Sequence, residues 1–307
     1  MTRFREFLRA EGFAGTDNEL PESTKRFPDG AQCRVEIPSV EGPEVLDAVL
    51  AEADERAVPV HRVSQGSGGM LLTSDELRRV AGTARQRGIE VSLFARPLTG
   101  WGSSAAALAA GAGALAAQAR GTEQVVHNLE DIARTVEAGI RSVLITDLGV
   151  LDIASKLRAA GEFPAGLQFK ISVQMGLSNP PAVRLAEQLG ANTYNVPTDL
   201  TLGQLAAIRA AVDIPLDIYL ESPDDQGGLV RHMEIGEIVR VAAPVYLKFG
   251  LRNSPNIYPS GTHLEPVAVA LGRERVRRAQ IGLEFLERQL PDAVMSKLPV
   301  EDLAVPV

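Results

Sequence analysis

The chain has 307 residues, of which 45% are hydrophobic and 23% charged, as is ordinary for a globular protein. This length fits one large domain, since α/β barrels often exceed 250 residues as a single unit. The net charge of −8 argues against nucleic acid as a partner. The sequence has neither an apolar run of about 18 residues nor a signal-peptide pattern, so we expect a cytoplasmic protein without a membrane partner.

The sequence contains one cysteine, Cys33. A single cysteine excludes an intrachain disulfide, a cysteine-ligated zinc site and an iron–sulfur cluster. This cysteine usage is typical of the reducing cytoplasm. We predict no cofactor, and a divalent cation is the one cofactor left open.

Short β-rich runs alternate with helical segments after a charged N-terminal extension over residues 1–30. The runs cover residues 33–39, 58–65, 89–97, 142–147, 167–174, 192–197, 214–221 and 245–250. Eight consecutive β–α units predict a parallel sheet, and eight strands close into a (βα)8 TIM barrel. We therefore expect a single α/β barrel domain over residues 31–290, followed by a C-terminal tail over residues 291–307.

An open doubly wound sheet is the alternative fold. Such a sheet typically has a glycine-rich phosphate loop after its first strand. The corresponding stretch here, "IPSVEGPE", is not such a loop. The barrel is therefore the favoured prediction.

Helix start and stop signals separate the β-rich runs. Thr73 stands three residues before Glu76, which is the spacing of a capping box, and Gly88 ends that helix. Asn179 is an expected N-cap, and a long helix over residues 264–289 follows the last run. These signals support the alternation of strands and helices.

One stretch, residues 100–121, is rich in alanine and glycine and makes the loop after the third strand unusually long. In a barrel this loop lies on the catalytic face. Two interpretations are open: a lid that shapes the substrate site, or a small-residue helix packed closely on the barrel.

The alternation of side chains along each strand predicts which residues face the lumen. Apolar residues should face the helices, so the flanking Phe169 and Ile171 direct Lys170 inward. The same reasoning places charged residues in the lumen on four strands: Glu36, Lys170, Asp217, Glu221 and Lys248. Barrel interiors are filled mainly by branched apolar residues, so this cluster predicts a functional site.

The second strand leaves two sets open, because either His61 and Gln65 or Arg62 and Ser64 can face inward. Barrel active sites lie at the carboxyl ends of the strands. Two turn-rich loops, 222–234 and 252–265, follow the last two strands and should lie on that face. Predicted substrate-binding residues are Glu36, His61, Arg62, Arg96, Asp147, Ser172, Gln174, Asn195, Tyr219, Arg252 and Asn253.

Two lysines near carboxylates support more than one chemistry. A lysine with a lowered pKa forms a Schiff base with a carbonyl substrate or acts as a general base. A carboxylate acts as a general acid or base in isomerisation or hydrolysis. The predicted catalytic residues are Lys170, Lys248, Glu221 and Asp217.

A third option is a divalent cation held by oxygen ligands, with Glu36, Asp147, Glu221 and His61 as candidates. This option is the least specific, because no HExxH or comparable ligand spacing occurs. We therefore assign no metal ligands. No GxSxG motif for a serine nucleophile occurs either.

Residues 58–222 resemble the collagenase-like peptidase family, which are U-type peptidases of unassigned catalytic mechanism. The matching stretches are "ARQRGIEVSL", "LITDLGVL", "SVQMGLSN", "LGANTYNVPTDLTLGQL" and "IPLDIYLE". Asp217 and Tyr219 fit the family pattern, whereas Glu221 departs from it. The family's cysteine-rich signature is missing, as a single cysteine requires.

The resemblance implies a barrel with this strand order and a hydrolase activity. Some relatives carry iron–sulfur clusters and take part in hydroxylation of RNA or quinones, and this chain lacks the cysteines for that role. We expect an enzyme of small-molecule metabolism acting on a small polar, anionic substrate in the barrel mouth. The alternatives are a lysine-dependent lyase, aldolase or isomerase acting on a carbonyl or sugar-acid substrate, and a non-enzymatic ligand-binding barrel; a homo-oligomer also stays open.

Overall fold

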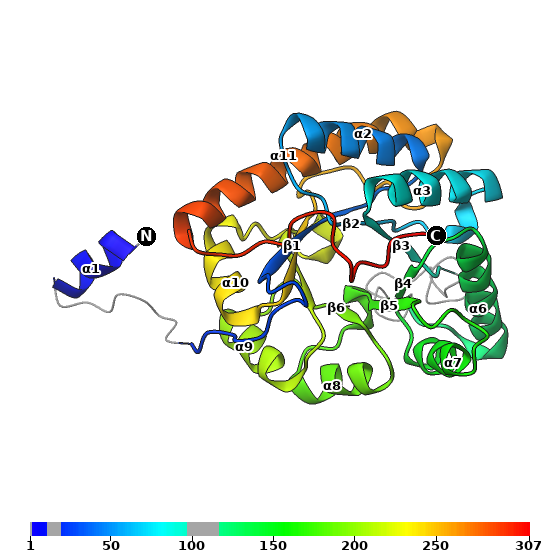
Figure 1. The fold of residues 1–307 in the computed structure, drawn as a ribbon, viewed down its shortest axis with the longest axis horizontal. Coiled ribbons are helices and arrows are strands. Elements are labelled where there is room, and N and C mark those ends of the chain that lie inside the picture. Colours follow the sequence, from blue (N-terminus) through cyan, green and yellow to red (C-terminus); the bar gives the residue numbers. More distant parts are fainter. Residues whose placement is uncertain (1, 11–19, 97–116) are drawn as a thin grey trace.

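The computed structural model describes residues 2–10, 20–96 and 117–307, and its strands form a closed parallel barrel in the order β1 to β8 (Figure 1). The strands are β1 (Cys33–Pro38), β2 (Arg62–Ser64), β3 (Glu90–Phe94), β4 (Ser142–Ile145), β5 (Gln168–Ile171), β6 (Thr193–Asn195), β7 (Leu216–Glu221) and β8 (Val245–Phe249). The (βα)8 TIM barrel is confirmed as a single domain, and the doubly wound alternative is wrong.

Helices cover the outside of the barrel (Figure 1). They are α2 (Pro43–Glu55), α3 (Ser74–Arg87), α6 (Gly121–Glu137), α7 (Leu148–Ala159), α8 (Pro180–Gln188), α9 (Leu202–Ala211), α10 (Ile235–Ala242) and α11 (Glu265–Gln289). A further helix, α1 (Thr2–Ala10), precedes the barrel. None of the helices in the described part of the chain is long and apolar enough to cross a membrane.

The predicted helix signals act as expected. Thr73 and Glu76 form a complete capping box at the start of α3, and Gly88 ends the helix in the left-handed region at φ 63°. Asn179 accepts a hydrogen bond from the backbone N–H of Ala182 and so caps α8. These local contacts set the points at which the chain leaves each strand.

Each strand is shorter than the run that the sequence predicts, and two of the differences bear on the site. The β2 ladder covers Arg62–Ser64 rather than residues 58–65, and β5 ends at Ile171 rather than at residue 174. Beyond Ile171, the Ser172 hydroxyl accepts a hydrogen bond from the backbone N–H of Gln174, and a 3-10 turn begins. This turn bends the chain over the carboxyl end of the barrel.

The core lies between the strands and the helices. Apolar strand residues such as Val35, Phe169, Ile171 and Leu247 are fully buried on that side. Burying one such side chain contributes about 1.5–3 kcal/mol, which fixes the register of every strand. The predicted alternation therefore places the polar strand residues in the lumen.

The amino-terminal end of the barrel is closed by segments from both ends of the barrel domain. Phe27 packs edge-on against Tyr246, with 5.3 Å between ring centroids. The buried Arg34 donates two hydrogen bonds to Asp302, at 2.9 and 2.6 Å. The residues expected as a C-terminal tail (red in Figure 1) thus run across this end of the strands.

The long loop after β3 falls mostly outside the described residues, which resume at residue 117. Neither interpretation of residues 100–121, lid or packed helix, is addressed by the structure.

Candidate functional site

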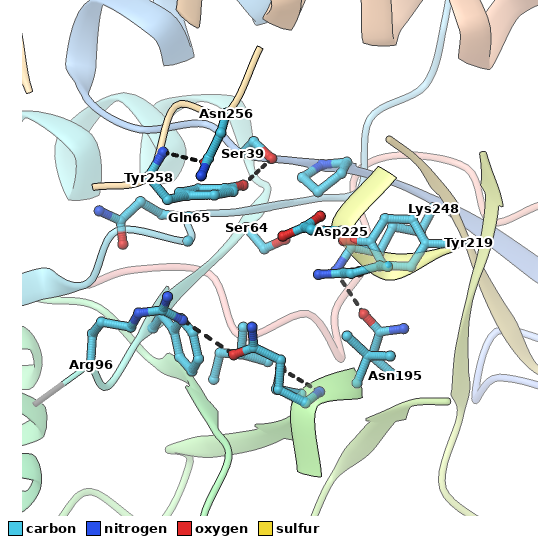
Figure 2. A pocket seen from close by; sticks show the side chains of 18 residues that line it. Ser39, Ser64, Gln65, Arg96, Asn195, Tyr219, Asp225, Lys248, Asn256 and Tyr258 are labelled. Atoms are coloured by element: carbon cyan, nitrogen blue, oxygen red, sulfur yellow. Dashed lines mark hydrogen bonds between the residues drawn. The ribbon is translucent and has the colours of Figure 1, made fainter. Parts of the chain in front are cut away.

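A polar cavity of about 180 Å³ lies at the carboxyl ends of the strands (Figure 2). Its lining comes from all eight strands or the residues directly after them, and from the loops after β7 and β8. The polar lining residues are Ser39, Ser64, Gln65, Arg96, Ser172, Gln174, Asn195, Tyr219, Asp225, Gln226, Lys248, Asn256 and Tyr258. This position matches the face on which barrel enzymes carry their active sites.

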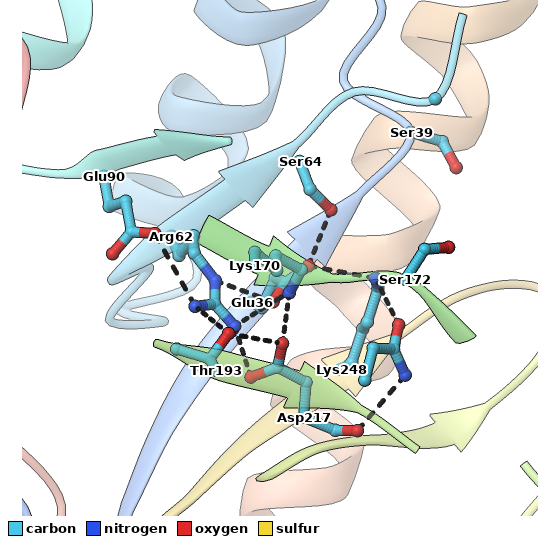
Figure 3. Close-up of polar contacts among 12 residues, drawn as sticks. Glu36, Ser39, Arg62, Ser64, Glu90, Lys170, Ser172, Thr193, Asp217 and Lys248 are labelled. Atoms are coloured by element: carbon cyan, nitrogen blue, oxygen red, sulfur yellow. Dashed lines mark hydrogen bonds and ion pairs between the residues drawn. The ribbon is translucent and has the colours of Figure 1, made fainter. Parts of the chain in front are cut away.

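A network of buried ion pairs lies directly below the cavity (Figure 3). Lys170 contacts Glu36 and Asp217, each at 2.5 Å. Arg62 contacts the same two carboxylates, at 2.6 and 2.5 Å. A buried charge is costly unless it is paired and hydrogen-bonded, and these four groups satisfy one another.

Secondary contacts complete the network. The hydroxyl of Ser64 donates to Glu36 at 2.6 Å, and that of Thr193 donates to Asp217 at 3.1 Å. Glu90 lies 3.6 Å from Arg62. The guanidinium of Arg62 also stacks on the ring of Tyr246, 3.5 Å from its centroid. The lumen below the cavity is therefore filled by a network of charged side chains rather than by the apolar side chains usual in barrels.

Burial and the neighbouring charges of opposite sign act against each other on the pKa values of Lys170 and Glu36. Burial lowers the pKa of Lys170 to about 8, helped by Arg62 and opposed by Asp217 and Glu36. For Glu36, burial favours the neutral form, but the cations Arg62, Lys170 and Lys248 outweigh it and hold the pKa well below its usual range. The carboxylate of Glu36 therefore stays ionised at neutral pH.

Lys248 connects this network to the cavity. Its ammonium lies 3.1 Å from Glu36 and donates to the side-chain oxygen of Asn195 at 2.9 Å. Asn195 is itself oriented, because its amide donates to the backbone oxygen of Asp217. Lys248 lines the cavity and is only 3% exposed. A cation is thus fixed at the cavity floor, where it can act on a bound ligand.

Arg96 supplies a second cation from the far side of the cavity (Figure 2). Its guanidinium donates to the side-chain oxygen of Gln174 at 3.2 Å. Burial lowers the pKa of Arg96 to about 10, so the group still carries its charge at neutral pH. Two cations on opposite walls favour an anionic ligand.

Asp225 extends from the turn η4 (Asp224–Gln226) after β7 toward the middle of the cavity (Figure 2). Partial burial raises the pKa of this carboxyl above its ordinary value. A carboxyl group with a raised pKa, close to bound substrate, is suited to proton transfer.

The roof of the cavity includes a strained residue. Ser39 follows β1 with φ at 61°, in the left-handed region that few non-glycine residues adopt. Its hydroxyl shares a hydrogen bond with the hydroxyl of Tyr258, which holds the ring over the cavity. Such strain clusters at functional sites.

The structure brings most of the predicted site residues together, at two depths. Arg96, Ser172, Gln174, Asn195, Tyr219 and Lys248 line the cavity. Glu36, Arg62, Lys170 and Asp217 form the network beneath it and do not line the cavity. Of the predicted catalytic residues, Lys248 alone reaches a ligand in the cavity.

The lumen position predicted for Glu221 is wrong. Tyr219 is paired with Lys248 but Glu221 with Phe249, so β7 has two residues where β8 has one. This bulge reverses the alternation. Glu221 therefore points toward the helices, where its carboxylate lies 3.6 Å from both His232 and Arg278.

The alternative in the second strand is resolved in favour of Arg62, so the placement of His61 at the site is wrong. The ring of His61 accepts from the backbone N–H of Val35 at 3.0 Å and lies 2.9 Å from the backbone oxygen of Ser296. Burial lowers the pKa of His61 to about 4, so the ring is neutral. His61 ties the C-terminal segment to the barrel.

Asp147, Arg252 and Asn253, also predicted to bind substrate, do not line the cavity. The carboxylate of Asp147 caps α7 by accepting from the N–H of Val150 and also accepts from the N–H of Ala119. Arg252 is 61% exposed and lies 3.9 Å from Asp224.

The residues considered as metal ligands do not converge. Glu36 lies in the lumen, Glu221 faces the helices and Asp147 caps a helix. Within residues 2–10, 20–96 and 117–307, no three histidine, cysteine or acidic side chains are placed to hold a metal ion.

Several lining residues are not among the predicted site residues: Ser39, Ser64, Gln65, Asp225, Gln226, Asn256 and Tyr258. Ser64 belongs to the inward set of the second strand that was left open. Asp225 and Tyr258 lie in the two loops expected on the catalytic face. A strand period predicts the direction of a side chain, and a loop offers no such period.

The fold and the site define a (βα)8 barrel with a polar, cationic cavity at the carboxyl ends of its strands. The model of peptidase family U32 matches residues 114–221, about a third of the chain. The chain thus resembles the U32 peptidases in sequence over this central part. No curated protein matches the chain.

Several solved structures match parts of the chain at low sequence identity. The U32 peptidase Mk0906 is 14% identical, with a TM-score of 0.40 over 67% of this chain and 73% of that one. The putative copper homeostasis protein CutC from Streptococcus agalactiae is 10% identical, with a TM-score of 0.47 over 70% and 98%. A truncated 3-deoxy-D-arabino-heptulosonate 7-phosphate synthase from Thermotoga maritima is 12% identical, with a TM-score of 0.47 over 90% and 95%.

Proposed function

We propose that this chain is a barrel enzyme that binds a small anionic substrate in the cavity and stabilises negative charge on a substrate oxygen with Lys248. The observation that carries this proposal is the position of the Lys248 ammonium. Glu36 and Asn195 hold it at the cavity floor, at 3.1 and 2.9 Å, while it lines the cavity. A charge fixed before the reaction stabilises a transition state without reorganising.

The substrate class follows from the size and charge of the cavity. The cavity is small, with a volume of about 180 Å³. A folded polypeptide chain does not fit such a space, but a small metabolite does. Lys248 and Arg96 favour an anion, and the many hydroxyl and amide groups favour one rich in oxygen.

The reaction class is one in which an oxygen gains negative charge. Hydrolysis of a small amide or ester, as the family resemblance implies, builds this charge on a carbonyl oxygen. Cleavage or isomerisation next to a carbonyl builds it on an enolate oxygen. In either reaction Asp225 is the proposed proton acceptor and donor.

Lys170 and Asp217 are positioning residues in this proposal. They do not line the cavity, and they hold Glu36 and Arg62 in one arrangement beneath it. Glu36 in turn holds the ammonium of Lys248, so the network fixes the direction of the acting cation.

The test is a turnover screen with small amides, esters, 2-oxo acids and sugar acids, using wild type, Lys248→Met and Lys248→Arg. We expect Lys248→Met to lower kcat/KM by about 10²–10³-fold, as removal of one oxyanion-stabilising donor does. Lys156→Met is the matched control, because Lys156 is 68% exposed on α7 and remote from the cavity. Equal turnover by wild type and Lys248→Met would contradict the proposal.

Borohydride added during turnover distinguishes a lysine that forms a Schiff base from one that acts only through its charge. A Schiff base gives a reduced adduct on Lys248, whereas an electrostatic role gives turnover without an adduct. We expect no adduct, because Lys248 is held as a cation against Glu36. Ligand binding by wild type without turnover of any substrate class would favour a non-enzymatic barrel.

A further inference from the structure

A second cavity of about 220 Å³ lies beside the first, between the loops after β7 and β8 and the helix α11. Tyr219 and Tyr258 line both cavities and form part of the wall between them. Leu251 and Ile257, 4% and 2% exposed, give the second cavity apolar walls. The proposed reaction makes no use of this space.

The second cavity contains a buried arginine whose charge is left without a direct partner. Arg275 of α11 lines it and is only 4% exposed. Its Nε and Nη1 atoms are buried and have no hydrogen-bond partner among the described residues. By contrast, the buried arginines of the lumen, Arg34 and Arg62, each donate to carboxylates at 2.9 Å or less.

The nearby acids do not pair with Arg275. Glu41 acts on it electrostatically, but its two carboxylate oxygens accept from the backbone N–H groups of Gly66 and Ser67, each at 2.9 Å. Asp224 accepts from the backbone N–H of Asn253 and lies 3.9 Å from Arg252. Asp225 lines both cavities, and the cation that acts on its carboxyl group is Arg96 rather than Arg275.

An unpaired guanidinium in an apolar pocket is costly, and the usual remedy is a bound oxyanion. The planar fork of arginine matches a carboxylate or a phosphate with two parallel hydrogen bonds. Burial lowers the pKa of Arg275, which shows how poorly the protein alone compensates its charge. An anion in this cavity would give the guanidinium of Arg275 the counter-charge that no described side chain supplies by direct contact.

We propose that the second cavity is an oxyanion subsite in which Arg275 binds a carboxylate or phosphate group. The subsite itself rests on the geometry around Arg275, and its link to the substrate rests on the proposed function. Because the two cavities share walls, the substrate class becomes a small molecule with two acidic groups. One group binds at Lys248 and Arg96, and the other at Arg275.

The experiment is a calorimetric titration of the full chain with inorganic phosphate and, separately, with malonate. We expect two binding sites per chain for whichever of these two anions binds more tightly. Lys248→Met should remove one site and Arg275→Met the other, each weakening binding by roughly tenfold or more. Arg277→Met is the matched control, because Arg277 is half exposed on the same helix.

Thermal unfolding provides a second readout that a structural role of Arg275 would not produce. Without anion, Arg275→Met should unfold at a higher temperature than wild type, because it removes a buried unpaired charge. Anion should raise the unfolding temperature of wild type by more than that of Arg275→Met, because the variant keeps only the site at Lys248. Arg275→Lys, which keeps the charge but loses the fork, should bind with intermediate affinity and covers the case of a Met variant that fails to fold.

The possible failures are distinguishable. One site that is lost in Lys248→Met and kept in Arg275→Met overturns this inference and leaves the proposed function standing. One site that is lost in Arg275→Met and kept in Lys248→Met supports the subsite and contradicts the proposed function. Destabilisation by Arg275→Met with unchanged anion binding overturns the subsite.

Discussion

Lys170 and Lys248 lie at different depths of one charged lumen, and this difference decides what each can do. Lys170 is enclosed by Glu36 and Asp217 and does not reach the cavity. Lys248 shares Glu36 with it but faces the cavity as well. Lys170 therefore belongs to a buried network, whereas Lys248, on another strand, is the cation that we propose acts on a ligand.

The first prediction concerns the stability contributed by the two lysines. Lys170→Met should lower the free energy of unfolding by about 3–5 kcal/mol, since it leaves two buried carboxylates with Arg62 as their shared cation. Lys248→Met should cost less, because Glu36 keeps Arg62, Lys170 and Ser64 as partners. Urea unfolding of both variants measures the two losses of unfolding free energy. A larger loss for Lys248→Met than for Lys170→Met would contradict the prediction.

The second prediction concerns pH. The folded-state pKa of Glu36 lies well below its ordinary value of 4.5, so its stabilisation is fully present above pH 4.5 and is lost as the pH falls through the folded-state pKa. Glu36→Gln should be several kcal/mol less stable than wild type at pH 7. The gap should narrow steadily below pH 4.5, as unfolding curves of both proteins measure; a constant gap would mean that the charge of Glu36 does not stabilise the fold.

The elements show where sequence periodicity is sufficient and where it fails. The alternation of apolar and polar residues predicts the lumen positions of Glu36, Lys170 and Lys248, because burial fixes the register of each strand. The same period misplaces Glu221, because one bulged residue reverses the pattern. No local property of the sequence reveals that bulge.

The sequence does not predict which side chains of the loops point into the cavity. Their position on the catalytic face follows from the fold, but the inward direction of Asp225 and Tyr258 depends on contacts with other elements. Tyr258, for example, is held by Ser39 and by the close approach of Gly66. For this part of the site, the sequence therefore predicts which loops contribute, but not which of their residues line the cavity.

The third prediction tests that close approach. A Cβ atom at Gly66 would lie 2.5 Å from a ring carbon of Tyr258, so Gly66→Ala must displace the ring. We expect about 1–3 kcal/mol of destabilisation and weaker anion binding. Gly82→Ala is the control, because Gly82 has open space in α3 and alanine favours a helix by about 1 kcal/mol. Unchanged anion affinity in Gly66→Ala would show that Tyr258 does not shape the cavity.

At the scale of the whole molecule, the two ends of the barrel have separate tasks. The amino-terminal end is closed by Phe27, His61 and Asp302, which bind the chain segments before and after the barrel. The carboxyl end carries both cavities. Stability and ligand binding are therefore separable by position.

The fourth prediction uses this separation. Asp302→Ala removes the two-pronged partner of the buried Arg34 and should cost about 2–3 kcal/mol of unfolding free energy. Anion binding at the carboxyl end should be unchanged. Asp292→Ala, at an exposed position of the same C-terminal segment, is the control for stability. Loss of anion binding in folded Asp302→Ala would show that the two ends are coupled.

The most direct test of the central claim is a crystal structure of the protein soaked in selenate, whose anomalous signal locates the anion. The account predicts a selenate in the first cavity in contact with the ammonium of Lys248, and its loss from that position in Lys248→Met crystals. Selenate confined to the outer surface of wild type, or bound in the cavity equally well without Lys248, would contradict it.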